Sequence, residues 1–481
     1  MSQNQIKDFN FFYAFLPIII LVGFLACNIY FFADDATGGP NQIALLIATA
    51  FAIILANRIG FSWKKMQKGM VNSIKSALPA ILILLMIGAL AGTWMISGIV
   101  PAMIFYGLDI LNPTIFLFAA CIISAIVSIA TGSSWTTVAT VGVALLGIGQ
   151  VMGLSNGLIA GAIISGAYFG DKMSPLSDTT NLAPAMAGTD LFTHIRYMMY
   201  TTFPTMTITL IIFLVLGLNY SGSADASSIS TMQAAISSKF NINPVLFLVP
   251  VFVIFLIIKK VDALPALFLG TMVGAVFAII FQPQIIKNIS GISDNYTFAS
   301  YKTFMQTLSG SVSVTTTNDE VNNLLSTKGM AGMMNTIWLI FCAMAFGGAM
   351  EAAGFLKKIT ATIMKGVKST GSLIASTAGT CLFFNATASD QYLAIVVPGR
   401  MFADVYEEKG LAPENLSRTL EDSGTVTSVL IPWNTCGAVQ SSVLGVATGE
   451  YAVYCFFNWM SPIVTVLFGY FNIKIRKLVK K

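Results

Sequence analysis

The stretch GDKMSPLSDTTN, residues 170–181, decides what kind of fold this chain has. It interrupts a long apolar run, and it places Gly170 and Pro175, which break helices, among clustered polar side chains. A charged group kept inside a membrane span costs about 2.5 to 3.5 kcal/mol, so retained charges are candidates for function. The stretch therefore predicts a broken transmembrane helix whose polar groups face protein or a wet cavity.

The composition of the whole chain indicates a membrane protein. Of its 481 residues, 56% are hydrophobic and only 10% are charged, whereas a soluble domain carries about 25% charged residues. The mean hydropathy is +0.78. The six cysteines show no C-x-x-C spacing, and the basic residues punctuate apolar runs, so neither a zinc site, nor a disulfide framework, nor nucleic-acid binding is expected. The first apolar run has no small-residue cleavage site after it and predicts a span, not a signal peptide.

The apolar runs set the number of spans, since a spanning helix needs about 20 mostly apolar residues. Spans are predicted near residues 11–32, 41–57, 78–98, 155–182, 197–218, 244–258, 261–281, 331–353, 421–447 and 452–472. Two more apolar stretches, 114–150 and 371–399, are interrupted midway by small polar residues and predict re-entrant hairpins whose tips point at an internal site. The expected fold class is an all-α polytopic membrane protein with about ten transmembrane helices, two re-entrant hairpins and two broken helices.

The distribution of positive charge gives an orientation. With the N-terminus inside, 21 of the 26 Lys and Arg residues fall in predicted inside segments. Cytoplasmic segments of membrane proteins carry this excess. Both termini are therefore expected to be cytoplasmic.

An internal repeat appears when the chain is slid along itself. A shift of 256 residues places Thr131 on Thr387 and Ser133 on Ser389, and a shift of 257 places Pro175 on Pro432. Each half has five spans and one hairpin, and an odd number of crossings inverts the second half, as in many secondary transporters. The expected domains are a first inverted repeat at 1–220 (hairpin 114–150, broken helix 155–190), a Ser-rich linker at 221–243 and a second repeat at 244–481 (external insertion 283–330, hairpin 371–399, broken helix 421–447).

The two hairpin tips and the two helix breaks supply the predicted ion-binding groups. These are Ser133, Ser134, Asp178, Thr179, Asn181, Ser389, Asp390, Asn434 and Thr435. At a shift of 256, Ser134 corresponds to Asp390 and Asp178 to Asn434, so each half contributes one carboxylate. Oxygen ligands of this kind suit small hard cations, and Na+ is expected to bind Asp178 and Asp390. Because a cation and a proton compete for one carboxylate, these two acids suffice for cation/proton exchange.

Secondary candidates for the site are Asp171, Lys172, Ser177, Glu351 and Asp422. Asp171 and Lys172 are adjacent and would face different directions on a helix, so charge balance in the break is as good an interpretation as ligation. Glu351 lies near the inner end of its span, where an interfacial carboxylate is the simpler interpretation and a proton relay the other.

For two acids and the only histidine, a structural role is preferred to a role in ion binding. Glu421 and Asp422 are expected to open a span, so at least one of them should cap a helix N-terminus. His194 is expected in a solvated cytoplasmic segment, with pH sensing as the alternative. Residues 61–78 alternate Lys with apolar residues at helical spacing and predict an amphipathic surface helix.

Three motifs carry a family resemblance: GSSWTTVATVGVALLGIG from residue 132, ISGAYFGDKMSPLSDTTNLA from residue 164, and the segment from ASDQYLAIVVPGR to IPWNTCGA over 388–438. They resemble the NhaC-type Na+/H+ antiporter family of the ion transporter superfamily, across roughly residues 60–470. The resemblance implies a bacterial inner-membrane exchanger of Na+ for H+, a homodimer, a moving domain built from hairpins and broken helices, and no cofactor. The same family includes exchangers that couple Na+ and H+ to malate and lactate.

Three alternatives remain beside cation exchange. An exchanger of small organic acids would need a cationic group in the cavity, for which Lys172 is the first candidate and Arg400 the second. An intramembrane aspartyl protease could use Asp171, in a Gly-Asp motif, with Asp390, but it gives no reason for paired helix breaks. A passive channel is the third alternative. Since exchange needs no catalytic group, an enzyme is not expected.

Overall fold

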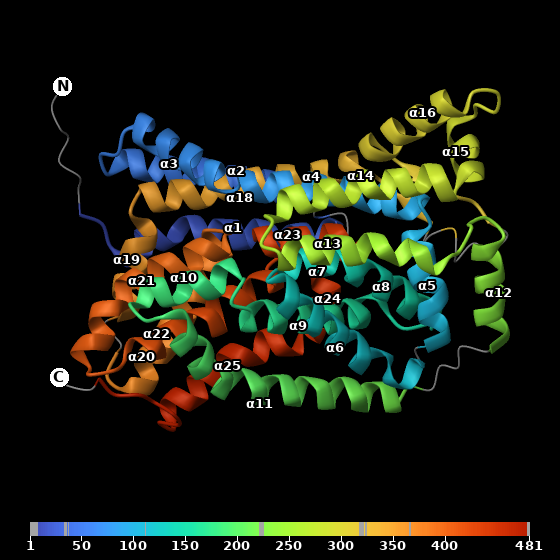
Figure 1. Cartoon of the computed structure of the whole chain (residues 1–481). Helices are drawn as coiled ribbons and strands as arrows, with labels where there is room; N and C mark the ends of the chain where they lie inside the picture. Colours follow the sequence, from blue (N-terminus) through green and yellow to red (C-terminus); the bar gives the residue numbers. More distant parts are fainter. Residues whose placement is uncertain are drawn as a thin grey trace.

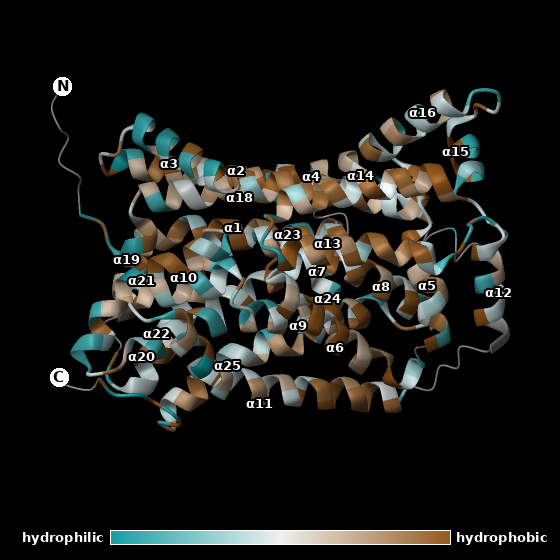
Figure 2. Cartoon of the chain, in the orientation of Figure 1, coloured by the Kyte–Doolittle hydropathy of each residue, from teal (hydrophilic) through white to brown (hydrophobic). Residues whose placement is uncertain are grey.

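The computed structural model describes residues 8–32, 36, 38–110, 112–220, 226–316, 322, 325–364 and 367–478. Most helices run roughly along one long axis, with α2, α4, α14 and α18 on one side and α6, α9, α11 and α25 on the other (Figure 1). Hydrophobic residues predominate along the middle of the bundle, and hydrophilic residues gather at its two ends (Figure 2). This division is the one expected of a protein that crosses a bilayer.

The helix bounds of the first half follow the apolar runs. They are α1 Phe11–Phe32, α2 Pro40–Arg58, α3 Trp63–Ser76, α4 Leu78–Ile96, α5 Ile99–Ile110, α6 Pro113–Thr131, α7 Ser134–Thr137, the π-helix η2 Val138–Gly142, α8 Val143–Val151, α9 Asn156–Met173, α10 Asp178–Ala187, α11 Leu191–Leu218 and α12 Ala226–Ser237. The amphipathic helix predicted at 61–78 is confirmed as α3, which packs on α18.

The second half adds short irregular pieces between its helices. Its elements are η3 Pro244–Phe247, α13 Leu248–Ile258, α14 Ala263–Phe281, α15 Pro283–Ser290, α16 Tyr296–Ser309, β1 Val312–Ser313, β2 Ser326–Thr327, η4 Met330–Met333, α18 Met334–Ala352, α19 Phe355–Met364, α20 Thr370–Thr387, α21 Gln391–Glu408, α22 Pro413–Leu420, the π-helix η5 Glu421–Thr425, η6 Ser428–Leu430, α23 Thr435–Leu444, α24 Thr448–Tyr451, η7 Ala452–Tyr454 and α25 Phe456–Tyr470. Strands β1 and β2 pair antiparallel.

The helices confirm the prediction of an all-α polytopic membrane protein. Within the described residues, eight helices are long and apolar enough to cross a membrane, or nine when the bent pair Thr448–Tyr454 and Phe456–Tyr470 is taken as one span. Both arms of the predicted hairpin 114–150 are among them, since α6 and the segment Ser134–Val151 each reach that length. The helices α20 and α21, which form the second predicted hairpin, pack against each other.

Close packing of α6 on α9 holds the centre of the first half together. A Cβ at Gly166 would lie 2.0 Å from the carbonyl oxygen of Cys121, and one at Gly170 would lie 2.4 Å from that of Ala125. Small residues at such contacts let membrane helices approach backbone to backbone. The position of Asp171, at the end of α9, depends on this contact.

We expect Gly166→Ala to destabilise the folded protein by about 1–3 kcal/mol, because the added methyl group overlaps the backbone of α6. The matched control is Gly379→Ala on α20, where the added Cβ would have no atom within 4 Å. This variant should not be destabilised, because alanine has a higher helix propensity than glycine. Thermal unfolding in detergent measures both variants. Equal melting temperatures for the two would contradict the assigned contact.

The bounds of the helices recur along the chain. Helices α4 and α18 begin 256 residues apart, and the pairs α6 and α20, α9 and α22, and α10 and α23 each begin 257 apart. Helices α10 and α23 also end alike, on Gly188 and Gly445 in the left-handed conformation. Their N-caps, Ser177 and Asn434, stand 257 apart as well.

This register corrects one detail of the predicted correspondence. The N-cap that matches Asp390 is Ser133, and the N-cap that matches Asn434 is Ser177, so the pairings of Ser134 with Asp390 and of Asp178 with Asn434 are each one residue off. The reason is a change of spacing from 256 to 257 between α4 and α6, in connections that no sequence motif marks.

Three predicted boundaries are wrong. The broken helix expected at 421–447 begins earlier, at Pro413, so Glu421 and Asp422 lie in mid-helix and do not cap an N-terminus. Helix α11 begins at Leu191 and buries His194 completely, where a solvated segment was expected. Residues 226–237 of the predicted linker form α12, while residues 221–225 lie outside the described residues.

Candidate ion-binding site

Both predicted hairpin tips and the first helix break line one cavity of about 650 Å³, which the second break reaches through Thr435. The site candidates on its wall are Ser133, Ser134, Asp171, Ser177, Asp178, Thr179, Asp390 and Thr435. They come from both halves of the chain. A second cavity, of about 530 Å³, lies between α4, α18 and α23 and includes Lys328. The first cavity includes Lys260, which the charge pattern placed on the opposite side of the membrane from Lys328.

The first tip is fixed against the first break. Gly132 ends α6 with φ +68°, and a Cβ there would lie 2.6 Å from Cβ of Leu176 in the break. The Asp171 carboxylate accepts hydrogen bonds from the Ser134 hydroxyl at 2.7 Å and from the Ser134 N–H at 3.1 Å. Only glycine fits the turn at 132 without strain. The tip and the break therefore form one rigid wall.

The second tip is fixed against the second break in the same way. Ser389 has φ +60°, and its carbonyl accepts from the N–H of Thr435 at 3.0 Å. The Trp433 indole donates to the carbonyl of Ala386 at 2.7 Å. Asp390 then caps α21, its Oδ1 accepting from the N–H of Leu393 at 3.0 Å.

The cavity is acidic. Asp171 and Asp390 are nearly buried in its wall, and Asp178 is exposed at its surface. Two further residues of the lining were not among the predicted site residues: Asp262, a fourth acid, and Lys260, the only basic residue of the lining within the described chain. Both residues lie in the loop between α13 and α14, a polar pair that ends an apolar run and gave no other signal. Four acids against one lysine make the cavity attractive to cations.

Four helices begin at the cavity wall. The N-terminal residues or N-caps of α7, α10, α21 and α23 all line it. Helix N-termini attract negative charge, including the carboxylates Asp178 and Asp390 that stand there. The same N–H groups could bind an anionic substrate.

Several predicted site residues lie away from the cavity wall. Asn181 is exposed and donates to the carbonyls of Pro175 and Ser177. Asn434 is buried and caps α23. The other predicted residues absent from the lining are Ser389, which is buried at the second tip, Lys172, Asp422 and Glu351, which is exposed at the end of α18.

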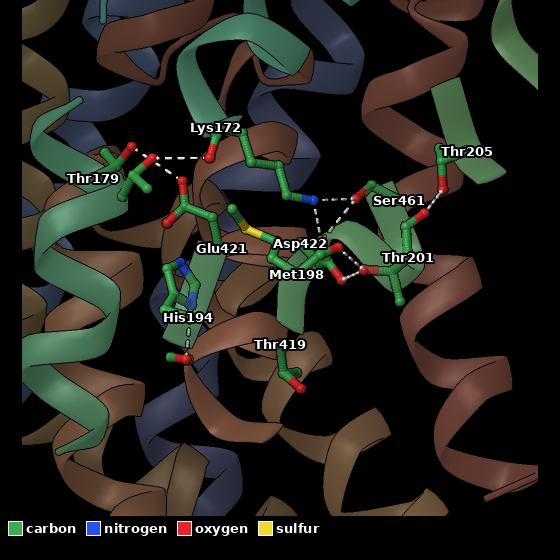
Figure 3. A network of polar contacts seen from close by, with 12 residues as sticks. Lys172, Thr179, His194, Met198, Thr201, Thr205, Thr419, Glu421, Asp422 and Ser461 are labelled. Atoms are coloured by element: carbon green, nitrogen blue, oxygen red, sulfur yellow. Dashed lines mark hydrogen bonds and ion pairs between the residues drawn. The ribbon is translucent and has the colours of Figure 1, made fainter. Parts of the chain in front are cut away.

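Lys172 and Asp422 form a buried ion pair between the halves, 250 residues apart in sequence (Figure 3). The Ser461 hydroxyl bridges them, 3.3 Å from each partner, and the Thr201 hydroxyl donates to the other oxygen of Asp422 at 2.8 Å. Both charged side chains are fully buried. Lys172 is therefore not the cationic group that an organic anion would need in the cavity. Arg400, the other candidate, is exposed and outside the lining.

Glu421, like Asp422, was expected near a helix N-terminus and lies in mid-helix. It is fully buried in η5, and its Oε1 accepts from the Thr179 hydroxyl at 3.1 Å. The hydroxyl of Thr179 also contacts that of Ser177 at 3.1 Å. Thr179 therefore lines the cavity, but its hydroxyl is hydrogen-bonded to Glu421 and Ser177. We therefore no longer expect Thr179 to be an ion ligand. The structure places Glu421 in a π-helical segment. Such segments are frequent at functional sites, so this feature marks Glu421 as a candidate for function.

The chemistry of the donors limits the kind of ion site. Within the described residues, no group of three or more His, Cys, Asp or Glu side chains is arranged to hold a metal ion. A transported cation would therefore use one or two carboxylates together with hydroxyls and the carbonyl groups that helix breaks set free.

Comparison with known proteins agrees with these features. A model of the Na+/H+ antiporter family matches residues 166–473. The Na+/H+ antiporter NhaC of Alkalihalophilus pseudofirmus is 38% identical over 91% of each chain. The malate-2H+/Na+-lactate antiporter of Bacillus subtilis is 36% identical over 96% of each chain. The arginine/ornithine antiporter ArcD of Halobacterium salinarum is 37% identical over 95% of this chain and 91% of its own. With its family model and these relatives in accord, the chain belongs to the Na+/H+ antiporter family.

Proposed function

We propose that this protein exchanges Na+ for H+ across the bacterial inner membrane by alternating access. The single observation that carries the proposal is the acidic cavity, in which Asp171, Asp178 and Asp390 meet at two helix breaks and two tips. Family membership supports it, and the relatives named as antiporters favour transport over peptide hydrolysis. No cofactor takes part, and Na+ and H+ are the transported species.

The proposed architecture is a pair of inverted repeats, with both termini cytoplasmic and two copies of the chain forming a homodimer. The recurrent helix bounds support the repeat. Two cavities, one including Lys260 and the other Lys328, support access from opposite sides. In such transporters the two halves move around a site near the middle of the membrane.

Exchange follows from competition at the acids. Na+ binds Asp178 and Asp390 with help from the hydroxyls of Ser133 and Ser134 and from main-chain carbonyls, and a proton takes its place when Na+ leaves. If the protein changes sides only when either species is bound, each Na+ that moves one way is matched by protons that move the other way. The apparent affinity for Na+ therefore rises as pH rises.

Exchange of a small organic acid is the second candidate. The four helix N-termini at the cavity favour it, because they can bind a substrate carboxylate. The malate/lactate antiporter is also among the relatives. Against it, Lys260 is the only basic side chain of the described cavity lining and faces four acids.

We expect purified protein in proteoliposomes with an acidic interior to raise the internal pH when Na+ alone is added outside. A pH-sensitive dye inside the vesicles reports the change. Malate with lactate, and arginine with ornithine, form separate arms of the same assay, and empty liposomes are the control. A pH change that requires either organic pair would overturn simple cation exchange and identify the substrate class.

A further inference from the structure

Glu421 is a buried acid that the exchange described above does not use. None of its side chain is exposed, and it does not line the cavity. Its Oε1 accepts the hydrogen bond from Thr179, whereas its Oε2 has no hydrogen-bond partner among the described residues. A buried ionised carboxylate that has only hydroxyl donors and no cationic partner is poorly compensated. Its state of protonation therefore responds to small changes in its surroundings.

The charged groups on α9 and on its own helix leave Glu421 without an ion-pair partner. Lys172 and Asp171 of α9 act on it electrostatically, but Lys172 forms its ion pair with Asp422. Arg418, one turn earlier on α22, lies over the rings of Tyr197 and Phe468, and its guanidinium has no hydrogen-bond partner in the described part of the chain.

The other neighbouring helices add few charges. His194 of α11 belongs to the polar network drawn in Figure 3, and its Nδ1 contacts the Ser417 hydroxyl, one turn before Glu421, at 2.8 Å. Helix α10 contributes Asp178, at the cavity. Helices α20 and α25 contain no charged side chain, and Arg400, Asp404, Glu407 and Glu408 of α21 are exposed. When Glu421 gains or loses a proton, the net charge of this region therefore changes by one, and Glu421 has no cationic ion-pair partner to offset the change.

Two hydroxyls connect this acid to the cavity. When Glu421 is ionised, Thr179 donates to it and the Thr179 oxygen can accept from Ser177 (3.1 Å for each contact). When Glu421 is protonated it can donate to Thr179, which must then turn its own hydrogen to Ser177. The oxygen of Ser177 already accepts from the N–H of Thr180, so the hydrogen of Ser177 turns away from Thr179 to the Asp171 carboxylate in the wall of the cavity. A hydrogen in that position competes with a cation for the carboxylate.

We propose that Glu421 binds a second proton, distinct from the one held by the cavity acids, and that the Ser177–Thr179 hydroxyl pair couples this proton to cation binding. The inference rests on the proposed exchange of Na+ for H+. A proton on Glu421 adds positive charge and reverses the hydroxyl pair, and both effects weaken Na+ binding. By reciprocity, Na+ in the cavity expels the proton from Glu421.

The number of protons released per Na+ bound tests the proposal. Calorimetric titration of detergent-purified protein with Na+, in buffers of different ionisation enthalpy and between about pH 5.5 and 8.5, measures that number. We expect Glu421→Gln to bind Na+ and to release up to one proton fewer than wild type at the most acidic pH. For each pH unit in that range, the Na+ dissociation constant of the variant should then change by about tenfold less than that of wild type.

Two variants of Thr179 can still test the proposal if Glu421→Gln fails to fold. Thr179→Val removes the hydrogen bond that joins Glu421 to Ser177 through Thr179 and should also reduce the number of protons released, whereas Thr179→Ser keeps the hydroxyl and should behave like wild type. The exposed acid Glu408 supplies the control variant Glu408→Gln. Wild-type proton release in both Glu421→Gln and Thr179→Val would overturn the inference, as would loss of Na+ binding in both. Failure of wild type to bind Na+ or to release any proton would instead overturn the proposed exchange.

Discussion

Asp390→Asn should lower Na+-driven proton exchange in proteoliposomes by at least about 100-fold, which corresponds to losing about 3 kcal/mol of cation binding. Asp390 is nearly buried in the cavity wall, at the N-terminus of α21, and the first break lines the same cavity. An asparagine cannot exchange a proton and carries no charge for Na+. It remains a good N-cap, so α21 should begin where it does in wild type.

The matched control for this variant is Asp190→Asn. Asp190 also caps a helix, α11, by accepting from the N–H of Thr193, but it is exposed and lies outside the cavity. The control should exchange like wild type, and both variants should have wild-type melting temperatures. Exchange in Asp390→Asn with a normal rate and pH dependence would remove Asp390 from the site.

Lys172→Met should lower the free energy of unfolding by about 3–5 kcal/mol, because it leaves the Asp422 carboxylate buried without its partner. Thermal unfolding in detergent and the yield of monodisperse protein measure the loss. The double variant Lys172→Met with Asp422→Leu should recover most of the stability, since an apolar pair of similar volume has no charge to desolvate.

A surface ion pair gives the comparison for Lys172→Met. Lys358 bonds Asp8 at 3.0 Å, with Asp8 almost fully exposed, and Lys358→Met should leave the melting temperature unchanged. The four variants of the Lys172 and Asp422 cycle yield their coupling energy directly. If Lys172→Met were as stable as wild type, the buried pair would contribute nothing to the fold.

Local sequence patterns were sufficient to predict most of the helices. The first span, the break after α9, and the two interrupted stretches at Gly132 and Ser389 were found because each feature depends on residues close together in the chain. A helix begins where apolar residues begin, and it breaks where proline, glycine and polar residues cluster. Helix α5 was missed because its 12 residues, though mostly apolar, are too few to span a bilayer, and the early start of α22 was missed because its eight residues are mostly polar.

The candidate site was predicted in part. The acids Asp178 and Asp390 share one cavity with Ser133 and Ser134 of the first tip, as their placement at breaks and tips suggested, whereas Ser389 of the second tip does not line it. Asn181 and Asn434 belong to the same motifs, but Asn181 donates to nearby backbone carbonyls, and Asn434 caps α23 and donates to Asn385 of α20. A motif specifies which residues stand at a break, and the packing around it decides which of them face the cavity.

The sequence by itself determined that this is a multispanning membrane protein with polar interruptions in otherwise apolar helices, because a bilayer accepts only long apolar runs and tolerates polar residues only at enclosed places. The tertiary structure alone decided the partners of the buried charges. Lys172 meets Asp422 across 250 residues, and Glu421 contacts Thr179 instead of capping a helix. Such pairs form between helices that are distant in the chain, so no local spacing encodes them.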